Sequence, residues 1–258
     1  MSPRSGIPGE SLLDLLEARA GIVCAVGAGG KKSVLQHLAA LHPGRVALTA
    51  TVFTTHFPEQ LGFALAIDDS EQLPARVAAL DAGASVAYAC PSDKPGRHAG
   101  VAGPIIGRIH REQGFAATYV KADGARMRWI KAPAEDEPVL PPECDTIIAV
   151  VSARAIGEPL DARVAHRIDH VRRVTGLHEG ERIAPAHVGR LIASPEGLQK
   201  SASGRRCVPL INMVDDAERA AFAREAAETA LRLNAAIERV VLTCLNRAGD
   251  PVVEVIRR

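Results

Sequence analysis

Residues 22–33 have the sequence Ile-Val-Cys-Ala-Val-Gly-Ala-Gly-Gly-Lys-Lys-Ser. An apolar run ends at three glycines and a lysine, and an amphipathic pattern with Val34, Leu35 and Leu38 follows at once. This order is typical of a buried strand, a phosphate-binding loop and a helix. The stretch therefore predicts the centre of an α/β fold and the place of its ligand.

The glycines of this loop favour an anion. They can adopt backbone angles that other residues avoid, so that N–H groups can converge on a phosphate. The N-terminal end of the following helix adds its positive dipole, and the lysine adds a charge for the outer phosphates. A glycine turn without a ligand is the alternative interpretation. The predicted phosphate-binding residues are Gly27, Ala28, Gly29, Gly30, Lys31, Lys32 and Ser33.

The loop departs from the common pattern G-x-x-x-x-G-K-[ST] at two places. Ala25 stands where the first glycine is expected, and Lys32 follows Lys31 where a hydroxyl normally ligates Mg²⁺. The shorter pattern G-x-x-G-K-T-[ST], as in Mur ligases, fits with only the threonine replaced. Ser33 is the alternative metal ligand, although it is turned by ~100° around the helix. We predict ATP or GTP as the ligand, and we expect nucleotide binding more readily than magnesium-dependent hydrolysis.

Composition excludes several classes of protein. The chain has 258 residues, with 31 basic and 30 acidic side chains, so no surface for a polyanion is expected. Five Phe, two Tyr and one Trp are too few for the stacking platforms that bind single-stranded nucleic acid. No apolar stretch is long enough to span a membrane. The five cysteines are scattered, and the first six residues lack the apolar core of a signal peptide. These features predict a cytoplasmic protein.

Apolar strands alternate with helical patterns along the chain, which predicts a mostly parallel sheet sandwiched by helices, as in P-loop proteins. Residues 157–206 interrupt the alternation with short helices, one of them from Pro195 onward. We therefore predict three segments: an α/β core in residues 1–156, a helical insertion in 157–206, and the end of the core in 207–258. Asp215 is the expected N-cap of a long helix, with Glu218 three residues on. Helices are expected from Ser11 to Ala20 and over residues 32–42. Strands are expected at 22–26, 45–50, 84–89, 116–121, 146–152, 208–212, 238–244 and 252–256.

Ligands of such sheets bind beyond the carboxyl ends of the strands, and polar segments follow several strands here. Asp123 follows one strand and is a candidate metal ligand or water-positioning residue. Thr51 lies in a threonine-rich segment after another strand and could contact a phosphate. Asn212 and Asp215 resemble the N-K-x-D motif by which GTPases read guanine, with Met213 in place of the lysine.

A further set of motifs follows the loop in a fixed order. Ala-Asp-Gly-Ala-Arg stands at 122–126 and Lys-Ala-Pro-Ala-Glu at 131–135. Glu137-Pro138, His166-Arg167 and the Asn212-x-x-Asp215 motif come next. Together these motifs resemble the YqeC family, which is described as a group of accessory proteins for selenium cofactor biosynthesis or selenium-dependent molybdenum hydroxylases. The resemblance extends over about residues 20–245.

The resemblance implies a P-loop-type protein that helps to mature a molybdenum hydroxylase. By position, Asp123 would be the acidic metal or water-positioning residue. Catalysis would rest on Lys31, Asp123, Arg126 and His166, while Lys131, Glu135, Glu137 and Arg167 would line the second half of the site. The family usually has Thr at Lys32 and Glu at Lys121, so two lysines stand where metal-friendly groups are expected. They could replace Mg²⁺ as counter-charges to phosphate.

Three interpretations of the function stay open at this point. The first is a nucleotide-binding accessory protein, an NTPase or nucleotide-dependent transferase in molybdenum or selenium cofactor maturation, with a hydroxylase as a client. The second is a degenerate P-loop protein that binds a phosphorylated cofactor or a client and hydrolyses nothing, which Lys32 and Lys121 favour. The third is a Mur-like ATP-dependent ligase, suggested only by the spacing of the loop.

Overall fold

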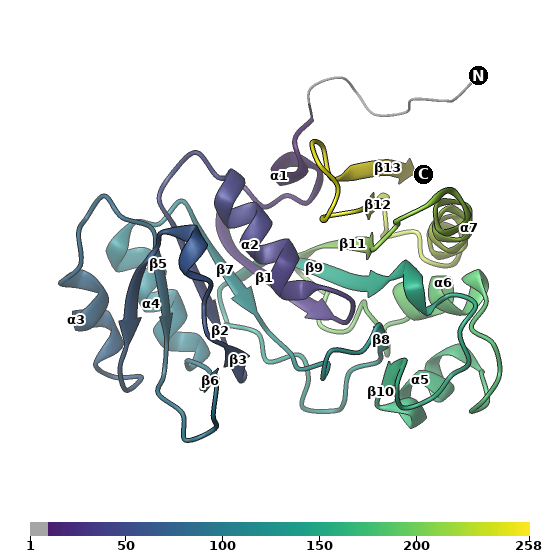
Figure 1. Cartoon of the computed structure of the whole chain (residues 1–258), viewed down its shortest axis with the longest axis horizontal. Coiled ribbons are helices and arrows are strands. Elements are labelled where there is room, and N and C mark those ends of the chain that lie inside the picture. Colours follow the sequence, from purple (N-terminus) through teal and green to yellow (C-terminus); the bar gives the residue numbers. More distant parts are fainter. Residues whose placement is uncertain (1–9) are drawn as a thin grey trace.

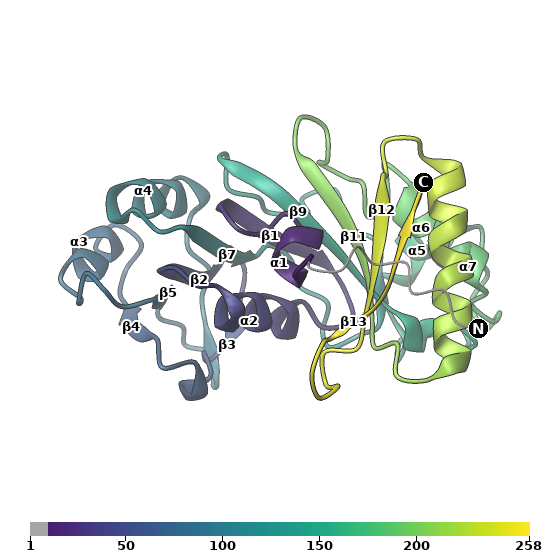
Figure 2. The ribbon, with the colours of Figure 1, turned by 90° about the horizontal axis from the view of Figure 1, so that it is seen from above.

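The computed structural model describes residues 10–258, so the first six residues, on which part of the expected localisation rests, lie outside it. A nine-stranded sheet in the order β13-β12-β11-β9-β1-β7-β2-β5-β4 forms the centre (Figures 1 and 2). Every neighbouring pair is parallel except β12 and β13. The prediction of a mostly parallel sheet is thus confirmed. The strands are β1 (Gly21–Gly27), β2 (Val46–Ala50), β4 (Ala64–Ile67), β5 (Val86–Ala89), β7 (Ala117–Lys121), β9 (Cys144–Ser152), β11 (Arg206–Asn212), β12 (Arg239–Thr243) and β13 (Val252–Arg257).

Helices cover both faces of this sheet, as predicted. The first two helices pack on one face through a hydrophobic cluster that includes Leu13, Leu35 and Leu38. The other helices pack on the opposite face, where a second cluster includes Ile106 and Leu191 (Figure 2). The helices are α1 (Leu12–Leu15), α2 (Lys31–Leu41), α3 (Leu73–Ala78), α4 (Gly103–Gln113), α5 (Ile168–Thr175), α6 (Pro185–Ala193) and α7 (Ala217–Leu233), with short 3₁₀ turns η1 (Glu59–Leu61) and η2 (Ala153–Ala155).

Strand β1 is continuously apolar because both of its faces are covered. Ile22, Cys24 and Val26 point into the cluster on one side, and Val23 and Ala25 into the cluster on the other. Full burial of an aliphatic side chain stabilises a fold by about 1.5–3 kcal/mol relative to its exposure. The strand that leads into the glycine loop is therefore held firmly, with β9 and β7 as its neighbours.

Two small pairs of strands lie outside the main sheet, one antiparallel and one parallel. The strands β3 (Thr54–Thr55) and β6 (Arg97–His98) pair with each other, and so do β8 (Ile130–Lys131) and β10 (Ala165–His166). Each has two residues, which is too short for a periodic pattern, so the sequence did not predict them. Both pairs lie next to the site described below.

Three local predictions were wrong. The N-cap of α7 is Asp216, whose side chain accepts from the N–H of Arg219, because Asp215 instead pairs with Arg154. The segment from Pro195 forms turns and no helix. The helix expected from Ser11 to Ala20 is the single turn α1, held by a capping box between Ser11 and Asp14.

Residues 157–206 contain α5, α6 and the strand β10. Helix α6 packs closely on α7, which belongs to the last part of the chain. The division into a core and an insertion stays a prediction. No helix within residues 10–258 is long and apolar enough to cross a membrane.

Candidate functional site

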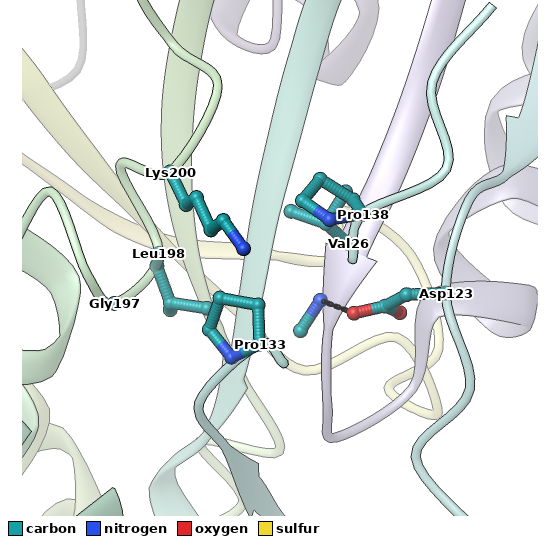
Figure 3. A pocket seen from close by; sticks show the side chains of 8 residues that line it. Val26, Asp123, Pro133, Pro138, Gly197, Leu198 and Lys200 are labelled. Carbon is teal, nitrogen blue, oxygen red and sulfur yellow. Dashed lines mark hydrogen bonds between the residues drawn. The ribbon is translucent and has the colours of Figure 1, made fainter. Parts of the chain in front are cut away.

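The register between β1 and β7 brings Asp123 beside the glycine loop. Ala25 pairs with Lys121, so two residues further on Gly27 and Asp123 are adjacent. The N–H of Gly27 donates to Asp123 Oδ2 at 2.9 Å, and the Asp123 side chain is almost fully buried (Figure 3). The loop after β1 and the loop after β7 thus form one site at the carboxyl edge of the sheet, as expected for a parallel sheet.

Three positions of the loop require glycine. Gly27, Gly29 and Gly30 have φ angles of 90°, 89° and 118°, in the region that residues with a side chain rarely adopt. A Cβ atom at Gly29 would lie 2.6 Å from the N atom of Ser152, and one at Gly30 would lie 2.5 Å from Asn212 Nδ2. The neighbouring strands β9 and β11 therefore press directly against the loop.

The backbone N–H groups of the loop fall into two halves. Those of Gly27, Ala28 and Gly29 donate to Asp123, to the carbonyl of Val150 and to the carbonyl of Arg128. In contrast, the N–H groups of residues 30–33 have no partner within residues 10–258. The donors open to an anion thus lie at the N-terminal end of α2, and the first half of the loop is held by the protein itself.

Five charged side chains form a continuous chain behind the loop, here called the charge chain. Lys31 Nζ lies 2.8 Å from Asp123 Oδ1, and it also donates to the carbonyl of Gly27. Lys131 Nζ lies 3.0 Å from Asp123 Oδ2 and 2.8 Å from Glu137 Oε2. Arg167 Nε donates to the same Glu137 oxygen at 3.0 Å. Three cations thus share two carboxylates, which leaves one excess positive charge.

The lysines of the charge chain are buried. The Lys31 side chain is 5% exposed and that of Lys131 is fully buried. Burial lowers the pKa of Lys31, and the Asp123 carboxylate only partly offsets this effect. Because ions are poorly solvated there, each needs its partner, and a negative ligand would be attracted by the excess charge.

His166 lies beside the charge chain, since β10 pairs it with Lys131. Burial, followed by repulsion from Lys131 and Arg167, lowers the pKa of His166 to about 4. Its imidazole is therefore neutral at pH 7, and one ring nitrogen can accept a hydrogen bond.

Glu137 should make the stability of the protein depend on acid pH. Burial alone would raise its pKa, but hydrogen bonds from Lys131 and Arg167 prevail and lower it from 4.5 to about 2. A carboxylate whose pKa is lowered by folding stabilises the fold at pH values above its ordinary pKa of 4.5. This contribution is lost as the pH falls towards the lowered pKa of about 2. We expect Glu137→Gln to reduce the free energy of unfolding by about 3 kcal/mol at pH 7, and by much less at pH 3.

Urea unfolding at the two pH values measures this difference. Glu135→Gln is the matched control, because Glu135 is exposed and its side chain lies outside the charge chain. Equal destabilisation by Glu137→Gln at pH 7 and pH 3 would contradict the assignment of the charge to Glu137.

Asn212 holds the glycine loop through a hydrogen bond to its backbone. It is buried, its Nδ2 donates to the carbonyl of Gly29 at 2.9 Å, and its Oδ1 accepts from Thr243 at 3.1 Å. Asp215 lies beyond it with Arg154 Nε at 2.7 Å. Both side chains of the N-K-x-D-like motif are thus engaged by the protein in this structure.

The remaining predicted residues lie around the edge of the site. Thr51 donates from its hydroxyl to the carbonyl of Val139 at 2.6 Å and so connects two loops. Arg126 is exposed in the loop after β7, with φ of 45°, and Glu135 is exposed near Lys200. Lys32 and Ser33 are exposed in the first turn of α2.

Sequence reasoning missed three residues that hold these loops. Lys200 donates to the carbonyls of Ala134 and Glu135, and it borders a small cavity with Gly27 and Asp123 (Figure 3). Thr243 and Arg154 hold Asn212 and Asp215 as described. Lone polar residues in turns and at strand ends carry no pattern that could have indicated these contacts.

The comparisons with known proteins point to one family. A family model described as YqeC protein matches residues 23–169, which include the loop and all five residues of the charge chain. An uncharacterized protein YqeC of Escherichia coli (strain K12) is 28% identical over 222 residues, which cover 83% of this chain and 84% of the relative. No solved structure matches.

Proposed function

Since this chain belongs to the YqeC family, we propose that it is a nucleotide-binding accessory protein in the maturation of a molybdenum hydroxylase. The observation that carries the binding part of the proposal is the end of the glycine loop. The N–H groups of residues 30–33 have no partner in the described part of the chain and lie at the N-terminal end of α2, beside the buried Lys31. Such a helix end with a lysine is suited to the phosphates of ATP, GTP or a phosphorylated cofactor. The pathway rests on the family resemblance alone.

The arrangement of Asp123 does not fit a magnesium ligand. Its two carboxylate oxygens lie 2.8 Å and 3.0 Å from the ammonium groups of Lys31 and Lys131. A divalent cation would have to displace an ammonium group and would meet Lys32 where a hydroxyl is usual. Within residues 10–258 there is also no group of three or more His, Cys, Asp or Glu side chains that could hold a metal. We therefore propose that the phosphates are neutralised by lysines and that binding does not require Mg²⁺.

The same geometry favours a second candidate, a protein that binds a phosphorylated ligand without hydrolysing it. Hydrolysis needs a group that positions the attacking water. Asp123 is the acidic residue nearest to the loop, and both of its oxygens are taken by lysines and by the N–H of Gly27. Release of phosphate by the purified protein, with and without a molybdenum hydroxylase, distinguishes the two candidates.

Nucleotide binding should raise the melting temperature with ligand concentration. We expect ATP, GTP, CTP or a molybdopterin nucleotide to raise the melting temperature. The ligand concentration that gives half of the full rise should be the same in Mg²⁺ and in EDTA. Strict dependence on Mg²⁺ would contradict the role of the lysines, and no shift with any of these ligands would contradict nucleotide binding. Gly29→Ala is the test variant, because its Cβ would meet the backbone of β9, whereas the control Ala28→Gly removes a methyl group and adds no atom to the loop.

A further inference from the structure

We propose that a cavity beside the first turn of α2 is a second anion site, which takes a tetrahedral oxyanion between Lys32 and Lys121. The cavity is bordered by α2, β2, β3 and the end of β7, and its polar lining residues include Lys32, Gln36, Thr54, Thr55, His56 and Lys121. Its enclosed volume is about 10 Å³, room for about one water molecule, and the rest of its space is open to solvent, so the anion would lie at the mouth of the cavity. The proposal rests on phosphate binding at the loop and names a further group that the site would accept.

Both lysines have donors left for a ligand. Lys32 Nζ donates to Thr55 Oγ1 at 2.7 Å, and Lys121 Nζ donates to the carbonyl of Phe53 at 2.8 Å. An ammonium group has three N–H donors, so each keeps two that the structure does not assign. Among residues 10–258, no carboxylate lines the cavity. The site thus offers donors and positive charge to an acceptor that carries negative charge.

Three of the four charged groups that act on Lys121 are positive. Lys31, Lys131 and Lys32 all repel its charge, and Asp123 is the carboxylate that attracts it. Lys32 in turn faces Arg97 from β6. An anion between the two lysines would offset this repulsion, whereas a metal ion would add to it.

The state of Lys121 supports the assignment. Burial, reinforced by the neighbouring lysines, lowers its pKa to about 7, so part of the protein carries a neutral amine there at neutral pH. An anion favours the charged form and raises that pKa again. Binding should therefore take up a proton, and the affinity should fall as the pH rises above 7.

The position of the cavity suggests two sources for the same chemistry. Lys32 is the second residue of α2, whose first N–H groups would hold the loop phosphates. The oxyanion is either the terminal phosphoryl group of a nucleotide on the loop or a free oxyanion of the same shape, such as inorganic phosphate. If the site takes the terminal phosphoryl group, ATP should bind more tightly than ADP. If it takes a free oxyanion, that oxyanion should bind to the protein at the same time as ADP.

Calorimetry on the full chain in EDTA tests the proposal with ATP, ADP and inorganic phosphate. For a terminal phosphoryl group, we expect Lys32→Gln and Lys121→Met each to reduce the preference for ATP over ADP by about tenfold or more, since each removes a hydrogen bond between charged groups. For a free oxyanion, the same variants should abolish phosphate binding to the protein saturated with ADP. Lys94→Met removes an exposed lysine outside the cavity and is the control for net charge.

Titrations in two buffers of different ionisation enthalpy add a second readout. Proton uptake near pH 7.5 should accompany binding to the wild-type protein and disappear in Lys121→Met. The proposal is overturned if ADP binds normally while both lysine variants leave ATP preference, phosphate binding and proton uptake unchanged. If neither ADP nor ATP binds the wild-type protein, the loop itself is not a nucleotide site, which is a failure of the proposed function.

Discussion

Asp123→Asn is expected to lower the free energy of unfolding by about 3–5 kcal/mol, the usual cost of removing one partner from a buried ion pair. The carboxylate lies between two buried ammonium groups, Lys31 and Lys131, and it also accepts from the N–H of Gly27. Asparagine has nearly the same shape but no charge. Both lysines would then face each other without their shared counter-charge, and the loop would lose a charged acceptor.

Chemical unfolding in urea at pH 7 measures this effect. Asp161→Asn is the matched control, because Asp161 pairs with Arg163 at the surface and an exposed pair contributes at most about 1 kcal/mol. The double variant Asp123→Asn/Lys31→Met should recover part of the loss, since it removes one of the two stranded cations. An Asp123→Asn protein as stable as the wild type would show that the charge chain is not intact in solution.

Features that depend on local pattern could be predicted from the sequence. Strand β1 and helix α2 were predicted to within a residue or two, because a strand covered on both faces is continuously apolar and a helix on a sheet is amphipathic. The glycines at 27, 29 and 30 were predicted as a special turn, and all three have positive φ angles. Here the chemistry of single residues determines the conformation directly.

The partners of the site residues could not be predicted in the same way. Asp123 and Gly27 are 96 residues apart, and the sequences of the two strands do not determine the register in which they pair. Lys31 was predicted for the outer phosphates and Asp123 for a metal or a water, and neither prediction contains the ion pair that the two residues form. The resemblance of Asn212 and Asp215 to a base-reading motif likewise did not indicate that Asn212 holds the carbonyl of Gly29, two strands away in the sheet.

The N-cap of α7 could not be predicted because two adjacent aspartates are both suitable for it. Asp215 and Asp216 are equally good caps by composition, and the choice of Asp216 depends on Arg154, which lies in the 3₁₀ turn η2 after β9. A tertiary contact therefore decides a local question. The same holds for Lys121, whose neighbours Lys31, Lys32 and Lys131 come from two other parts of the chain.

Lys31→Met is expected to weaken nucleotide binding by about 30- to 150-fold, the effect of losing a hydrogen bond of 2–3 kcal/mol to a charged phosphate. The stability of the ligand-free protein should change little. Without Lys31, the remaining charges of the chain balance, with Asp123 and Glu137 against Lys131 and Arg167. The methionine also fills most of the space of the lysine stem.

Calorimetry with the tightest nucleotide and urea unfolding without it measure the two sides of this prediction. Lys94→Met again controls for the loss of one positive charge. The contrast with Asp123→Asn is informative, because the anion at the centre of the charge chain holds several partners, while the ammonium group of Lys31 at its end donates to Asp123 and Gly27 and keeps one donor for a ligand. Strong destabilisation by Lys31→Met with unchanged affinity would reverse that assignment and make Lys31 a structural residue.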